Sequence, residues 1–357
     1  FVFQDIQGFE NNEDQLKLAL QWELEQLEMY PTDVLVYYVE AYDNDQVSGP
    51  KKSTSEMYRA RFPSLYEMYQ DVASEQDEAT ETVSGALEKS RDLKQKIDEL
   101  SLEMKRNLEM DWQQSQEVQE AMKKQQQIQE ELQQASQQLD EMMEKIEKNE
   151  LFSRETIQKL QEIQELYKDI MTPELQEAME NMNEALQNLD EQMVQQAMEQ
   201  LQLNMEEYNK TLDRTLSLLK KLKAEQKLEQ AQKLAQDLAE RQSDITEQSQ
   251  KQDADHTRLE REQQQISQDT EALSEVLDDL QQELSDIPNA PQEQVSAAQE
   301  QMQNDNLQNK LQELQAMMQQ NQMQQVPQQS SQAQQSFEKM ASNLQDAQNM
   351  MSGQMQQ

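Results

Sequence analysis

Residues 118–146 read VQEAMKKQQQIQEELQQASQQLDEMMEKI, and their apolar residues return every three or four positions. On an α-helix this spacing forms one stripe, and the Gln, Glu and Lys residues between them face water. The only polar member of the stripe is Gln125. Its positions are Val118, Ala121, Gln125, Ile128, Leu132, Ala135, Leu139, Met142 and Ile146. The segment predicts a long coiled-coil helix, with these residues as its seam.

The chain on either side lacks residues that stop helices. No glycine occurs between Gly85 and Gly353, and no proline occurs between Pro173 and Pro288. Glycine and proline are the residues that most weaken a helix interior. The seam pattern returns later in the chain at Leu175, Met182, Leu189, Leu212, Leu216 and Leu219. We therefore expect a mainly α fold, in which long coiled-coil helices fold back as an antiparallel hairpin.

Capping residues and polar stretches divide the helical region. Ser153 is placed as a helix N-cap, and Thr172-Pro173 gives a second helix start. Residues 246–258 carry almost no apolar side chain, and two prolines at 288 and 291 end the next seam. The predicted parts are a long coiled-coil helix at 63–149, a short connecting helix at 150–172, a second long coiled-coil helix at 173–245, a polar break at 246–258, a helix at 259–287, and a Gln/Met-rich helix with a disordered tail at 288–357.

Residues 1–62 have a different pattern, that of β-strands. Leu16 to Leu24 alternate apolar with polar or small residues, as in a half-buried strand. Residues 34–39 are apolar on both faces, a turn follows at 43–50, and residues 57–62 return as a further strand. Because so few strands do not form a stable sandwich, we expect a truncated, immunoglobulin-like β-sandwich remnant. Since the chain starts at Phe1, we interpret it as a fragment or a processed product.

The composition limits the possible functions. Only 35% of the 357 residues are hydrophobic, which suits elongated helices better than large compact cores. An excess of 71 acidic over 31 basic residues gives a formal charge of -40, which repels nucleic acids and anionic lipid surfaces. The chain has no cysteine, so disulfides and thiolate metal sites are excluded. We predict no catalytic, cofactor-binding or metal-binding residue, no enzyme activity, and no membrane-spanning segment.

One basic cluster stands out in this acidic chain. It consists of Lys210, Arg214, Lys220, Lys221, Lys223 and Lys227. Pairing with acidic residues of an opposing helix is the interpretation we favour, because a hairpin places an acidic helix alongside. The alternative is a docking site for an acidic partner, formed by Arg214, Lys220, Lys221 and Lys223.

Three segments resemble a known family. They are YYVEAYDND at 37–45 followed by VSGPK at 47–51, RFPSL at 61–65, and LDRTL at 212–216. They resemble the bacterial proteins grouped as domain of unknown function 4175, over roughly residues 34–242. The resemblance implies immunoglobulin-like strands after an N-terminal membrane anchor, then a long Gln-rich helical region. It also implies an extracytoplasmic envelope protein held at the inner membrane by an anchor upstream of this chain; no reaction is assigned to the family.

Two functional hypotheses follow. The first is a non-enzymatic coiled-coil scaffold or spacer of the bacterial cell envelope, which binds a protein partner or self-associates through its coiled coil. The alternative is an acidic helical adaptor or chaperone-like module that binds a basic or unfolded protein client.

Overall fold

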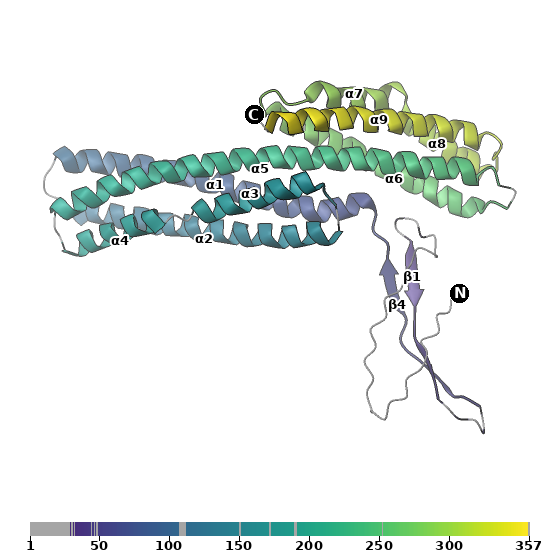
Figure 1. Ribbon diagram of the computed structural model, residues 1–357, viewed down its shortest axis with the longest axis horizontal. Coiled ribbons are helices and arrows are strands. Elements are labelled where there is room, and N and C mark those ends of the chain that lie inside the picture. Colours follow the sequence, from purple (N-terminus) through teal and green to yellow (C-terminus); the bar gives the residue numbers. More distant parts are fainter. Residues whose placement is uncertain are drawn as a thin grey trace. The chain divides into compact units, whose positions relative to one another are not determined.

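The computed structural model describes residues 33–106, 112–149, 151–170, 173–188, 191–251 and 253–355, except positions 44, 46 and 48, together with residues 29 and 31. The chain divides into two compact units, one ending at Pro63 and one beginning at Ser64. Short strands form the described part of the first unit, and helices form the second (Figure 1). The expected mainly α fold with a small β region is confirmed.

The first unit contains a β-hairpin. Its strands are β1 (Val34–Tyr37), β2 (Glu40–Tyr42), β3 (Lys52–Thr54) and β4 (Tyr58–Arg61). β1 pairs antiparallel with β4, and β2 pairs antiparallel with β3, so the two ladders are nested around one turn. At the turn, the Lys51 amide donates to Asp43 Oδ1 at 2.7 Å. The turn and the returning strand lie where the sequence predicts them.

The apolar hairpin residues are more exposed than the sequence predicts. Val34 and Val36 are 52% and 48% exposed, whereas a strand inside a sandwich would bury both faces. The expectation of burial on both faces is therefore wrong for the described strands. The physical reason is that the described strands form two nested pairs, and no second layer covers them among the residues that the structure describes. The strand predicted at Leu16–Leu24 lies outside the described residues.

The helices of the second unit follow in chain order. They are α1 (Leu65–Arg106), α2 (Trp112–Asn149), α3 (Arg154–Ile170), α4 (Pro173–Asn188), α5 (Glu191–Gln248), α6 (His256–Ser285), α7 (Gln292–Asn304), α8 (Leu307–Gln319) and α9 (Val326–Met355). Ser64 starts α1 with a capping box: its hydroxyl accepts from the Glu67 amide at 3.2 Å, and Glu67 Oε2 accepts from the Ser64 amide at 3.0 Å.

The predicted long helix at 63–149 is two helices that fold back on each other. Lys89 pairs with Glu131 at 2.7 Å, and Lys96 pairs with Glu117 at 3.8 Å. The partners move backward along α2 as the chain moves forward along α1, so the two helices are antiparallel. Folding back lets each helix cover the apolar stripe of the other, which a single straight helix cannot do within one chain. α1 ends at Arg106 and α2 begins at Trp112, and the residues between them lie outside those that the structure describes.

The predicted helix at 173–245 is also divided, into α4 and α5. The side-chain Nδ2 of Asn204 in α5 donates to the backbone carbonyl of Glu174 in α4 at 3.1 Å, so α4 folds back along the beginning of α5. α3 covers a later stretch of α5, where Lys159 pairs with Glu225 at 2.9 Å. The first bundle therefore consists of α1, α2, α3, α4 and α5 up to Leu222.

The second bundle consists of α5 from Ala224 onward and α6 to α9. The predicted break at 246–258 is shorter than expected, since α5 continues to Gln248 and α6 begins at His256. Asp255 caps α6 by accepting from the Arg258 amide at 3.1 Å.

The predicted disordered tail is instead the helix α9, which packs against α5, α7 and α8. Its buried residues return at three-four spacing and include Val326, Ala333, Phe337, Met340 and Leu344. This stripe buries enough apolar surface to order a Gln-rich segment, which corrects the expectation for residues 288–357.

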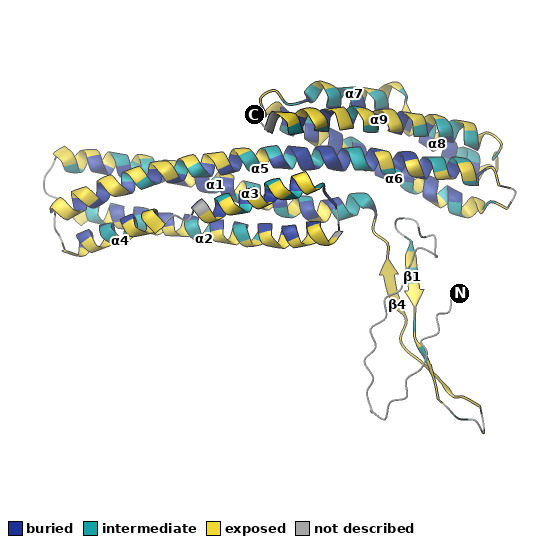
Figure 2. Cartoon of the chain, viewed as in Figure 1, coloured by how far each residue is buried: buried dark blue, intermediate teal, exposed yellow. Residues whose placement is uncertain are grey.

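Buried residues, dark blue in Figure 2, recur along the helices of both bundles and form one core cluster in each. α5 takes part in both, because Leu222 belongs to the first core and Ala224 to the second. The predicted seam residues that lie buried in the first core are Val118, Ile128, Leu132, Leu139, Met142, Ile146, Leu175, Met182, Leu212, Leu216 and Leu219. Leu189 lies outside the described residues.

Candidate functional site

Several buried or half-buried polar residues lie on α5, at and beyond the point where the two cores meet. A helix shared by two bundles presents buried polar groups to neighbours from both. We call the following set of α5 residues the polar junction. It comprises Lys223, Glu225, Lys227, Glu229, Lys233, Arg241 and Gln242.

Glu229 fixes the start of α3. Its side chain is buried, and it accepts from the Ser153 amide at 2.7 Å and from the Thr156 hydroxyl at 2.9 Å. Ser153 in turn caps α3, because its hydroxyl accepts from the Thr156 amide at 3.3 Å. The N-cap predicted at Ser153 is therefore present.

The carbonyl of Leu151, just before α3, accepts two further hydrogen bonds. Tyr69 of α1 donates to it at 2.8 Å, and Lys233 Nζ donates at 2.7 Å. Burial raises the pKa of the Tyr69 phenol, and the charge of Glu229 adds to the rise, so the hydroxyl stays a donor. The connection between α2 and α3 is thus tied to both α1 and α5.

Lys159 of α3 and Glu225 of α5 form an ion pair at 2.9 Å with little exposure to water. Burial raises the pKa of Glu225, and the hydrogen bond from Lys159 opposes that rise without cancelling it. Burial lowers the pKa of Lys159, but the hydrogen bonds to Glu225 and Glu155 outweigh it, and the net shift is upward. The pair therefore holds α3 in register on α5.

Lys223 and Lys227 connect the two bundles. Lys223 pairs with Asp77 of α1 at 2.6 Å and with Glu283 of α6 at 2.8 Å. Lys227 pairs with the same Glu283 at 2.7 Å and with Asp279 at 3.2 Å. One acidic residue of the second bundle is thus shared by two α5 lysines, one of which also contacts the first bundle.

These contacts divide the basic cluster that the sequence singles out. Lys223 and Lys227 pair within the chain, as does Lys210 with Glu206 at 2.8 Å. Arg214, Lys220 and Lys221 have no ion pair among the described residues, and Arg214 and Lys220 are exposed. The intramolecular interpretation holds for one part of the cluster, and the docking interpretation stays a prediction for the other.

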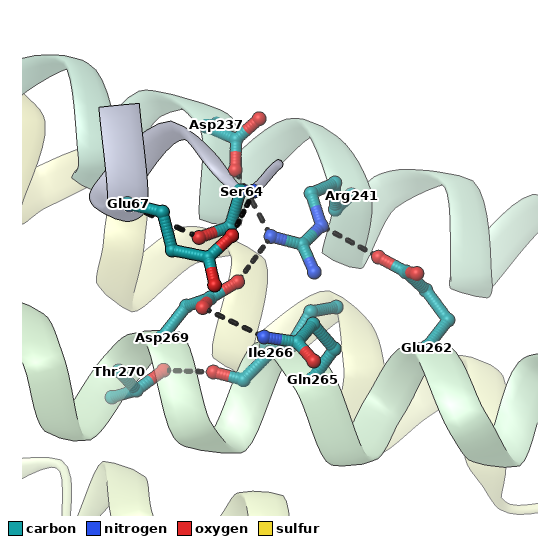
Figure 3. A network of polar contacts seen from close by, with 9 residues as sticks. All are labelled: Ser64, Glu67, Asp237, Arg241, Glu262, Gln265, Ile266, Asp269 and Thr270. Atoms are coloured by element: carbon teal, nitrogen blue, oxygen red, sulfur yellow. Dashed lines mark hydrogen bonds and ion pairs between the residues drawn. The ribbon is translucent and has the colours of Figure 1, made fainter. Parts of the chain in front are cut away.

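Further along α5, Arg241 lies inside the second bundle among carboxylates (Figure 3). Its Nε is 2.5 Å from Glu262 Oε1, and its Nη1 is 2.7 Å from Asp269 Oδ2 and 3.1 Å from Asp237 Oδ2. Gln265 donates to the other oxygen of Asp269 at 3.0 Å. We call Arg241, Asp237, Glu262 and Asp269 the Arg241 cluster.

The ionisation of this cluster is dominated by burial. Burial raises the pKa of Glu262 and of Asp237, and in both cases Arg241 opposes the rise without cancelling it. For Arg241 itself, burial lowers the pKa, but the surrounding carboxylates outweigh it and the net shift is upward. The guanidinium therefore stays charged, and Glu262 and Asp237 are the groups with a raised pKa.

Next to it, Gln242 joins three helices through uncharged groups. Its amide nitrogen donates to Gln263 Oε1 of α6 at 3.0 Å and to Ser330 of α9 at 2.5 Å. The Ser330 hydroxyl donates to the Gln242 carbonyl at 2.8 Å. Sequence reasoning missed this network and the Arg241 cluster. A signal was present, since Gln242 continues the three-four spacing of Leu228, Ala231, Ala235 and Leu238.

A shallow hollow lies elsewhere, between α1 and α2. It encloses about 330 Å³, and its lining includes Glu78, Glu81, Gly85, Glu131 and Gln138. A Cβ added at Gly85 would meet no atom within 4 Å, so packing within the chain does not require this glycine.

The part of the chain that the structure describes contains no group of three or more His, Cys, Asp or Glu side chains arranged to hold a metal ion. Over the same residues, none of the helices combines the length and the apolar character needed to cross a membrane. No known protein family, curated protein or solved structure matches the chain. The resemblance to domain of unknown function 4175 therefore stays an expectation.

Proposed function

We propose that this chain is a non-enzymatic scaffold or spacer protein of the bacterial cell envelope. The observation that carries the proposal is the continuity of α5, whose 58 residues enter both cores. At roughly 1.5 Å per residue the helix is about 87 Å long. Because buried neighbours surround it in both bundles, bending α5 would expose apolar side chains in at least one core.

The polar junction supports the same role. Glu229, Lys159 and Lys223 tie α3, α1 and α6 to the middle of α5, where a hinge between two bundles would otherwise be expected. The location in the envelope, with an anchor upstream and an extracytoplasmic helical region, is proposed from the family resemblance. The scaffold would bind a protein partner or self-associate through its coiled coil.

The rigidity of α5 can be tested by spin labelling, which suits a chain without cysteine. Labels on Glu207→Cys and Glu240→Cys, both at exposed α5 positions, flank the point between Leu222 and Ala224 where the two cores meet. A continuous helix predicts a narrow distance distribution centred at about 50 Å. The matched control, Glu207→Cys with Lys220→Cys, lies within the first bundle and should be as narrow. A broad distribution for the flanking pair alone would show a hinge and contradict the spacer.

A second candidate function is favoured by the hollow between α1 and α2. Its carboxylates Glu78 and Glu81 and its open glycine offer a place where a basic chain can approach the helix backbone. We propose oligolysine as a defined probe for this adaptor function. Glu81→Gln should weaken its binding at low salt, and the control Glu275→Gln on the exposed face of α6 should not. Equal losses in both variants would show general charge attraction and no site.

A further inference from the structure

The Arg241 cluster has an excess of negative charge inside the second bundle. Three carboxylates face one guanidinium, which leaves two negative charges uncompensated within the cluster. Arg241 is 6% exposed and Glu262 is 3% exposed, so bulk water screens them weakly. The guanidinium is also incompletely used, because its Nη2 has no hydrogen-bond partner among the described residues.

The charges around the cluster come from several elements. α5 contributes Asp237 and, about one turn later, Glu240. Burial raises the pKa of Asp237, and the charge of Glu240 adds to the rise. α6 contributes Glu262 and Asp269, with Arg258 one turn before Glu262. Figure 3 places Glu67, from the first turn of α1, in the same view. α9 contributes an uncharged group, Ser330, through Gln242.

We propose that the Arg241 cluster is a proton-operated lock between α5 and α6: the cluster takes up a proton as the pH falls, and the second bundle is then held together more tightly. At neutral pH the carboxylates repel one another across the helix contact. A proton removes one of these charges while the guanidinium keeps its remaining partners.

The direction of the effect follows from linkage. Burial raises the pKa of Glu262 and Asp237 in the folded chain, while in the unfolded chain both return to ordinary values. Between the unfolded and folded pKa values, the folded chain therefore binds more protons. Its stability rises as the pH falls through this window, is fully gained below the ordinary carboxyl pKa of about 4, and is lost as the pH rises through the folded pKa.

The neighbouring uncharged network keeps the lock from releasing the helices altogether. Gln242, Gln263 and Ser330 do not titrate, so they join α5, α6 and α9 at every pH. The second bundle therefore has a contact between α5 and α6 whose stability depends on pH. This property is separate from the proposed function and does not depend on a location in the envelope.

Hydrogen exchange and thermal unfolding at about pH 7.5 and at about pH 4.5, just above the ordinary carboxyl pKa, test the lock. In the wild type, the melting temperature and the protection of α6 amides, corrected for intrinsic exchange, should be higher at the lower pH. Glu262→Gln should raise the melting temperature at the higher pH by about 2–4 °C and reduce the pH dependence. The control Glu271→Gln, an exposed α6 carboxylate, should keep the wild-type dependence.

A second variant removes the cation of the cluster instead of a carboxylate. Arg241→Met leaves the carboxylates without their cation, so the second bundle should lose α6 protection at the higher pH and regain part of it at the lower pH. Two outcomes would overturn the proposal: wild-type α6 protection that is equal or lower at the lower pH, or a Glu262→Gln variant that keeps the full wild-type pH dependence.

Discussion

The two bundles share one helix but bury different kinds of polar group. The core of the first contains neutral side chains, among them Ser90, Gln125 and Tyr208. The ion pairs that join α1 to α2 and to the part of α5 before Leu222 lie at the surface, as Lys89 with Glu131 and Arg91 with Asp213 show. The second bundle instead buries Arg241 and its carboxylates between α5 and α6.

This difference separates two ways of fixing helix register. Exposed ion pairs contribute about 0–1 kcal/mol each, so the first bundle depends on its apolar stripe. Removing Arg241, the cation of the buried cluster, would leave its carboxylates uncompensated at a cost of about 3–5 kcal/mol, so the second bundle depends on this residue as well. The first bundle should therefore respond weakly to salt and pH, and the second should respond to pH.

The largest effect is expected from Phe337→Ala in α9. Phe337 is fully buried in the second core, and the loss of such a ring costs about 3–5 kcal/mol. Denaturant unfolding should show the loss, and hydrogen exchange should show whether it spreads along α5 into the first bundle. A control, Gln334→Ala on the same helix, should cost little because it removes no core contact. Equal stability of Phe337→Ala and the wild type would mean that α9 is not packed.

The same helix shows where sequence reasoning fails. The stripe at 118–146 is predicted because large apolar residues dominate it, and its members are buried as expected. The stripe of α9 has the same spacing but alternates Phe337 and Met340 with small residues such as Ala333 and Ala347 in a Gln-rich background. Low apolar content there favours disorder by composition, and only packing against α5 decides otherwise.

The turns and the charged cluster are harder to predict for other reasons. The sequence between Arg106 and Trp112 contains no proline or glycine, so no local helix breaker predicts that α1 and α2 are separate helices. Arg241 precedes a seam position, but a single sequence does not show that Glu262 and Asp269 of another helix will meet it. Local spacing therefore predicts helices and their buried faces, while pairing between helices depends on the whole chain.

The next largest effect is expected at the contact between the start of α3 and Glu229 of α5. Glu229→Ala leaves the Ser153 amide and the Thr156 hydroxyl without their acceptor in a buried site, which costs about 2–3 kcal/mol. Glu229→Gln keeps one acceptor oxygen and should lose less. Urea unfolding with hydrogen exchange at α3 measures both. If the two variants lose the same stability, the carboxylate acts by charge alone, and the hydrogen bonds to Ser153 and Thr156 contribute nothing.

A gain is expected in the core of the first bundle. The side-chain amide of Gln125 is buried beside the Tyr208 hydroxyl, and neither group reaches ordinary hydrogen-bond geometry among the described residues. Burial raises the pKa of Tyr208, and its weak interaction with Gln125 opposes that rise without cancelling it. Gln125→Leu removes this desolvation cost at similar volume and should stabilise the chain by about 1–2 kcal/mol. Thermal unfolding measures the gain, with exposed Gln127→Leu as the control. A loss of stability would show that the amide is hydrated or paired in solution, and the first core would then depend on polar groups as the second does.

The smallest effect concerns Gly85 in the hollow of the first bundle. An added Cβ meets no atom within 4 Å, so Gly85→Ala should stabilise α1 by about 0.5–1 kcal/mol through helix propensity alone. The neighbouring exposed Ser84→Ala is the control for propensity without a change in the hollow. If a basic chain approaches the helix backbone there, Gly85→Ala should also weaken oligolysine binding while Ser84→Ala leaves it unchanged. Because stability rises in both variants, a selective loss of binding cannot come from unfolding. Unchanged binding in Gly85→Ala would leave the hollow an ordinary surface, and the first bundle would then differ from the second only in how it is held together.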